Sequence, residues 1–204
     1  PILPELDENI KCGNSLVSRD DVEGMDISSD DLIRTAPFDW ESINGGELFD
    51  VVIGNPPYVK TEDIKKLHTA AETAVYKKYE SSYKQYDKYY LFLEKAMGLI
   101  KENGLVCYIV PNKFLHTESA EKIRLMLKDR ISRLDDFGAA QLFRDKTVYS
   151  SIVTIKGAGT EQLSYSVVHS AAELWNGESE PDHFIPKKQL NCMPWKGSED
   201  AADG

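Results

Sequence analysis

The sequence predicts an α/β fold in which a mostly parallel sheet ends in an antiparallel hairpin. Two apolar segments, 49–54 and 105–110, are rich in β-branched residues and have the composition of buried strands. A helical pattern lies between them at 87–101, and a strand, a helix and a strand in this order form a parallel unit. Two later strand-like segments, 133–137 and 148–155, are close enough in sequence to pair antiparallel.

Three helices are expected around these strands. Segment 61–79 has helical character, with Thr61 as a plausible N-cap. Segment 87–101 carries apolar side chains at helical spacing and should stop before Gly104, a typical C-terminal residue. A shorter helix is expected over 118–128.

The chain is long enough for one sizeable domain. Its 204 residues are 41% hydrophobic, which suffices to bury a single core. We expect one domain over 1–156, and over 157–204 the start of a following region or a partly disordered tail, because the periodicity weakens there. With neither a signal peptide nor about 18 consecutive apolar residues, the sequence predicts a cytoplasmic protein without a membrane partner. Its three separated cysteines predict neither a disulfide framework nor a metal site.

The distribution of charge bears on a nucleic-acid partner. The net charge of -10 argues against one, because DNA binding requires basic residues that neutralise phosphates. Residues 58–156, however, carry 18 basic and 13 acidic side chains, whereas both flanking segments are acidic. Residues 58–90 also interleave seven lysines with seven tyrosines, which suits either phosphate contacts and base stacking or a solvated helical face.

The most informative motif is Asn55, Pro56, Pro57 and Tyr58, directly after the predicted strand 49–54. Ligands of α/β sheets bind at the carboxyl ends of the strands. The asparagine oxygen and an adjacent backbone carbonyl can accept the two N–H groups of a planar amine and so orient its nitrogen toward a methyl donor. The prolines fix the backbone, and the tyrosine offers a stacking face. The alternative is a rigid turn with a packed tyrosine.

This motif and its surroundings resemble the adenine-N6 DNA methyltransferases of restriction-modification systems, particularly the type II enzymes fused to a nuclease. The resemblance extends from Asn9 to Lys156 and includes segments 86–92, 104–115 and 142–155. It implies a partial Rossmann-like methyltransferase sheet and S-adenosylmethionine as the cofactor. The implied substrate is double-stranded DNA whose target adenine is flipped out of the helix, since a stacked base cannot reach such a site.

The resemblance also implies roles for individual residues. The four residues of the motif would be catalytic, and the flipped base would stack between Tyr58 and Phe143. Asn14 would contact the cofactor through its side chain and Ser15 through its backbone. Two plainer interpretations stay open: Phe143 packs into the core, and the Gly13–Leu16 segment is a surface turn.

One part of the family pattern is missing from this sequence. The glycine-rich cofactor loop would precede Asn9, and Gly45-Gly46 does not open a helix after a strand. We therefore expect the sheet to lack its first strands, the isolated chain to bind S-adenosylmethionine weakly and to be inactive, and the open sheet edge to favour self-association. The alternatives are a methyltransferase acting on protein glutamine or RNA, and a non-catalytic module that binds DNA or protein.

Overall fold

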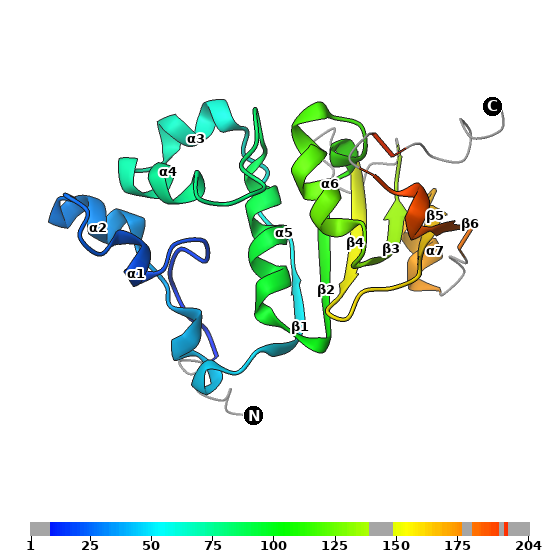
Figure 1. The fold of residues 1–204 in the computed structure, drawn as a ribbon, viewed down its shortest axis with the longest axis horizontal. Helices are drawn as coiled ribbons and strands as arrows, with labels where there is room; N and C mark the ends of the chain where they lie inside the picture. The colour runs from blue at the N-terminus through cyan, green and yellow to red at the C-terminus, as the bar shows by residue number, and fades with distance from the viewer. Residues whose placement is uncertain (1–8, 139–148, 177–180, 192–193, 196–204) are drawn as a thin grey trace.

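A computed structural model describes residues 9–138, 149–176, 181–191 and 194–195 (Figure 1). Among these residues no helix is both long and apolar enough to cross a membrane. The elements, with 3-10 helices written η, are α1 (Arg19–Val22), α2 (Ser29–Thr35), η1 (Trp40–Ser42), η2 (Asn44–Gly46), β1 (Phe49–Gly54), α3 (Thr61–Leu67), α4 (Ala70–Tyr76), α5 (Lys88–Leu99), β2 (Ile100–Pro111), η3 (Asn112–Leu115), η4 (Glu118–Ala120), α6 (Glu121–Leu127), β3 (Ile131–Asp136), β4 (Ser150–Lys156), β5 (Gln162–Val167), α7 (Ala171–Trp175), β6 (His183–Pro186) and η5 (Lys187–Gln189).

A single six-stranded sheet has the strand order β1-β2-β4-β3-β5-β6. The β1–β2 and β3–β5 pairs are parallel, whereas β4 is antiparallel to both β2 and β3, and β6 is antiparallel to β5. Strands β1, β2, β3 and β5 therefore run in one direction. The predicted α/β class with a mostly parallel sheet is confirmed, and β3 and β4 form the predicted antiparallel pair.

The sheet continues beyond residue 156. Strands β5 and β6 extend it past β3, although the sequence pattern in that region predicted no element. In β5, Leu163 and Tyr165 are buried, and so is Ser166, which blurs the alternation of apolar and polar side chains. A six-residue strand with so weak a pattern is difficult to find from sequence.

The core lies on one face of the sheet, where α5 packs on β1 and β2 and α6 packs beside α5 (Figure 1). Val106 and Val110 of β2 are fully buried on this face. The predicted strand 49–54 has the expected bounds, but its expected burial is wrong: Val51 is 56% and Ile53 is 79% exposed. A strand that is apolar on both faces suits a sheet covered on both sides, and in the described part of the chain no helix covers the face that carries these two residues.

The predicted helix over 61–79 is two helices. Thr69 is the N-cap of α4 and forms a capping box, in which the Glu72 amide donates to the Thr69 hydroxyl and the Thr69 amide donates to the Glu72 carboxylate. Thr61 is not an N-cap, because Lys60 holds that position in α3. The Thr61 hydroxyl donates instead to the carbonyl of Tyr86.

Gly104 lies inside β2, because α5 ends at Leu99 and β2 begins at Ile100, so the predicted helix stop is wrong. A Cβ atom at Gly104 would lie 2.8 Å from the Phe49 carbonyl oxygen and 3.0 Å from the Ile100 Cβ. The glycine is therefore required by close packing and not by a helix end. The helix expected over 118–128 is present as η4 followed by α6.

Candidate active site

The predicted catalytic loop follows β1 at the carboxyl end of that strand. Asn55 is exposed, Pro56 is buried and Tyr58 is half-buried. The Tyr58 hydroxyl donates to the Asn55 side-chain oxygen at 2.7 Å and lies 3.1 Å from the carbonyl oxygen of Ile109 in β2. Burial raises the pKa of Tyr58, so the phenol keeps the proton that it donates.

The start of α5 holds this loop in place through the backbone. Lys60 and Asp87 form an isolated antiparallel bridge, and the Lys88 amide donates to the Val59 carbonyl at 2.8 Å. The Tyr89 ring meets the Tyr58 ring edge-on, with 6.3 Å between the ring centroids. The residues directly after Tyr58 are therefore fixed to a helix and not left as an unsupported turn.

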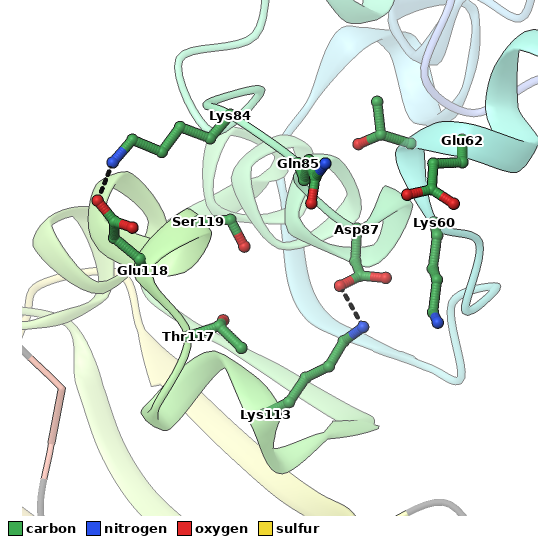
Figure 2. A pocket seen from close by; sticks show the side chains of 10 residues that line it. Lys60, Glu62, Lys84, Gln85, Asp87, Lys113, Thr117, Glu118 and Ser119 are labelled. Atoms are coloured by element: carbon green, nitrogen blue, oxygen red, sulfur yellow. Dashed lines mark hydrogen bonds and ion pairs between the residues drawn. The ribbon is translucent and has the colours of Figure 1, made fainter.

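A polar cavity of about 490 Å³ lies beside the loop (Figure 2). Lys60, Asp87 and Lys113 line one part of it, and Lys84 and Glu118 form an ion pair in another. The Lys113 Nζ atom lies 2.5 Å from Oδ2 of Asp87. The cavity therefore carries charges of both signs, most of them already paired.

Asp87 is a buried carboxylate with a compensating lysine. Its side chain is only 7% exposed, whereas that of Lys113 is 37% exposed. Burial raises the pKa of Asp87, and the positive charges of Lys113 and Lys60 act in the opposite direction without cancelling it. The sequence analysis missed this pair, because it joins residues that are distant in the chain.

Asn14, the predicted cofactor contact, is held by α4. Its amide nitrogen donates to Oε1 of Glu72 at 2.8 Å and to the Tyr76 hydroxyl at 3.1 Å, and its oxygen accepts from the Leu16 amide. Both amide hydrogens are therefore used. One of the two lone pairs on the oxygen is without a protein partner among the described residues, which leaves room for one donor from a ligand.

A chain of polar contacts connects Asn14 with the predicted catalytic loop. Glu72 Oε1 lies 2.8 Å from Nδ1 of His68, and the other ring nitrogen of His68 lies 3.2 Å from Nζ of Lys88. The Lys88 backbone in turn bonds Val59. Sequence inspection could have found one part of this network, because Thr69 and Glu72 have capping-box spacing.

The motif, the sheet and the loop suggest a comparison with nucleic-acid methylases. The sequence model of the family described as Eco57I restriction-modification methylase matches residues 3–143. The chain belongs to this family. The resemblance stated from the sequence is thereby confirmed, and the chain is a member of a methyltransferase family.

Sequence relatives agree with membership of the Eco57I family, and a solved structure shows a similar fold. The chain is 38% identical over 168 residues to the type II restriction enzyme and methyltransferase RM.Eco57I of Escherichia coli, which covers 81% of this chain and 16% of that protein. It is 27% identical over 162 residues to the type II methyltransferase M.TthHB8I of Thermus thermophilus, covering 78% and 35%. The type I restriction-modification methyltransferase subunit of Streptococcus thermophilus has the same fold, with a TM-score of 0.51 at 16% identity over 75% of this chain and 37% of that one. This chain spans well under half of each of these proteins.

In this Eco57I-family chain the residues predicted for the site fall into separate groups. Asn55 and Tyr58 lie together at the end of β1 and are hydrogen-bonded to each other. Ser15 lies beside Trp40, whose indole nitrogen donates to the Ser15 carbonyl at 3.0 Å. Phe143 lies outside the described residues, so its predicted stacking role stays a prediction. Among the described residues no cluster of three or more metal-ligating side chains is found.

Proposed function

We propose that this chain carries the catalytic site of an S-adenosylmethionine-dependent methyltransferase that acts on the N6 amine of adenine in DNA. The observation that carries the proposal is the exposed Asn55 oxygen, which accepts the Tyr58 O–H at the carboxyl end of β1. An acceptor that binds a donor there can bind the N–H of a planar amine in its place. The restriction-modification names of the relatives favour DNA over protein or RNA as the substrate.

The chemistry requires orientation more than a base. An adenine amine is a weak nucleophile, because its lone pair is delocalised into the ring. The Asn55 side-chain oxygen and the Pro56 carbonyl would each accept one N–H, which directs the nitrogen toward the incoming methyl group. The Tyr58 ring would stack on one face of the flipped base, and Phe143 stays the proposed partner on the other.

Asn14 fits the methyl donor as an acceptor. Its side-chain oxygen has one lone pair for the adenine amine of S-adenosylmethionine, while Glu72 and Tyr76 fix its orientation. Ser15 would add a backbone contact. When bound, the cofactor supplies a methyl group on a sulfonium centre, and the residues of this chain orient the acceptor amine. We further propose that the isolated chain binds S-adenosylmethionine weakly and is inactive. Tight binding of S-adenosylmethionine in a calorimetric titration of this chain would contradict that proposal.

The experiment is transfer of labelled methyl groups to unmethylated DNA by the full-length gene product. We expect label on adenine N6, and we expect Asn55→Ala to lower the transfer rate by about a hundredfold or more, as removal of one preorganised hydrogen-bond partner does in other enzymes. Asn103→Ala, at an exposed asparagine in the early part of β2, is the matched control and should leave the rate unchanged. Label elsewhere than adenine, or full activity of Asn55→Ala, would refute the proposal.

A further inference from the structure

An ion pair between a buried carboxylate and a partly exposed lysine joins the start of α5 to the segment after β2. Asp87 directly precedes α5, and Lys113 lies in η3, just beyond the carboxyl end of β2. Their charged atoms are 2.5 Å apart, and the Asp87 side chain is 7% exposed. Figure 2 shows the two side chains extending toward each other in the cavity. Removing a carboxylate from water is costly unless a partner compensates its charge, and Lys113 is that partner.

The Asp87 side chain does not cap helix α5, which it precedes. Asp87 occupies the N-cap position of α5, where aspartate is among the preferred residues, yet its side chain makes no capping hydrogen bond. Such a cap is typically worth about 1 kcal/mol. The carboxylate lies against Lys113 instead, which indicates that the contact between the two segments takes precedence over helix capping.

Both partners are tied to the ends of strands. The backbone of Asp87 pairs with Lys60, two residues after Tyr58. On the other side, Asn112 precedes Lys113 and donates from its side chain to Asp136 at the end of β3, at 2.9 Å. The Asp87–Lys113 pair is therefore the charged link between the loop after β1 and the residues after β2 and β3.

We propose that Asp87 and Lys113 are positioning residues, whose ion pair fixes the Asn55–Tyr58 loop relative to the end of β2 while the target base is bound. This inference rests on the proposed function. In this proposal the pair acts by holding the loop and not by contacting the substrate. Because a misplacement of about 1 Å can lower a rate by about a hundredfold, a rigid support for Asn55 and Tyr58 has direct consequences for methyl transfer.

Four variants of the full-length protein test the proposal. Asp87→Asn and Lys113→Met each break the pair, and the double variant Asp87→Asn/Lys113→Met removes both charges and leaves no uncompensated buried ion. Glu118→Gln is the matched control, because it breaks an ion pair in the same cavity whose glutamate side chain is 80% exposed. The readouts are kcat and KM for methyl transfer, fluorescence of 2-aminopurine at the target position, and hydrogen exchange of the Thr61 and Lys88 amides.

We expect kcat to fall about tenfold or more in the pair-breaking variants while KM for DNA changes less than about threefold, because orientation is lost rather than binding. The Thr61 and Lys88 amides should exchange faster, and the 2-aminopurine signal of the bound base should change. Glu118→Gln should match the wild type in all three readouts.

Two outcomes separate this inference from the proposed function. If the wild type transfers no methyl group to DNA, the proposed function fails, and unchanged exchange at Thr61 and Lys88 would then overturn the positioning role as well. If the single variants do not fold, the double variant decides. A folded double variant with wild-type kcat and wild-type exchange overturns the inference.

Discussion

The Tyr58 phenol donates a hydrogen bond to the side-chain oxygen of Asn55, at 2.7 Å. The same hydroxyl lies 3.1 Å from the Ile109 carbonyl, so its single hydrogen can be redirected from one acceptor to the other. The acceptor that the proposed reaction uses is thus satisfied within the loop before a substrate arrives. Binding of an adenine amine would exchange one hydrogen bond for another, at little net cost.

Substitutions at Tyr58 separate the ring from the hydroxyl. We expect Tyr58→Phe to keep kcat/KM within about tenfold of the wild type, because the stacking face remains and only one hydrogen bond of about 1 kcal/mol is lost. Tyr58→Ala should lower kcat/KM by about ten- to a hundredfold, since stacking of a base on an aromatic ring is worth about 1–3 kcal/mol. Methyl-transfer kinetics measure both. Equal losses in the two variants would contradict a stacking role.

The Glu72 carboxylate should stabilise the fold in a pH-dependent way. Burial would raise the pKa of Glu72, but hydrogen bonds from the Thr69 amide and from His68 outweigh it and hold the pKa below its ordinary value of 4.5. A depressed pKa in the folded state contributes stability that is present above the unfolded value and is lost as the pH falls through the folded one.

We therefore expect Glu72→Gln to lower the free energy of unfolding by about 1–3 kcal/mol at pH 7, the usual cost of disrupting a buried charged hydrogen-bond partner. The difference should shrink as the pH falls below 4.5. Urea unfolding at several pH values measures it, with Glu23→Gln, at an exposed position, as the control. If the loss of unfolding free energy in Glu72→Gln did not depend on pH, the ionised form of Glu72 would not be what stabilises the fold.

The two partners of the Asp87–Lys113 ion pair should differ in their effect on stability, because only the aspartate is buried. Burial raises the pKa of Asp87 despite Lys113, which means that ionisation of Asp87 is less favourable in the folded than in the unfolded chain. A raised carboxylate pKa gives stability that is greatest below the unfolded pKa and decreases as the pH rises through the folded one.

Lys113→Met leaves the buried carboxylate without its partner and should cost about 1–3 kcal/mol at neutral pH, decreasing in acid as Asp87 takes up a proton. Asp87→Asn should cost less, because the Lys113 side chain is 37% exposed and can turn toward water. Denaturant unfolding of both variants at pH 7 and in acid tests this order. A larger loss of unfolding free energy for Asp87→Asn than for Lys113→Met would contradict the expectation that the unpaired carboxylate is the more costly group.

The unpaired β1 edge of the sheet should promote self-association. Strand β1 pairs only with β2 among the described residues, and Ile53 is 79% exposed. An unpaired edge with apolar side chains is a template for another strand. We expect this chain to associate at high concentration, and we expect Ile53→Lys to reduce association without lowering the free energy of unfolding. Light scattering measures the mass, and a monomeric wild type at high concentration would contradict the expectation.

Much of the local structure could be predicted from the sequence. The bounds of β1, the position of the Asn55–Tyr58 motif directly after it, and the hairpin of β3 and β4 all follow from patterns of neighbouring residues. An apolar run that ends in two prolines specifies a strand and its end whatever lies around it, because backbone sterics and the missing proline N–H act locally. The resemblance to a methyltransferase family could be stated from the same short segments.

Tertiary structure decided what depends on distant partners. The sequence could not place β4 between β2 and β3, reveal that Ile53 faces outward, or pair Asp87 with Lys113. Asn14 and Glu72 are 58 residues apart, and only the packing of α4 brings them together. Burial and ion pairing depend on which surfaces meet, whereas strand and turn propensities depend on neighbours along the chain. The sequence alone therefore determined the motif and suggested the chemistry proposed for it, and the fold decided how that motif is supported.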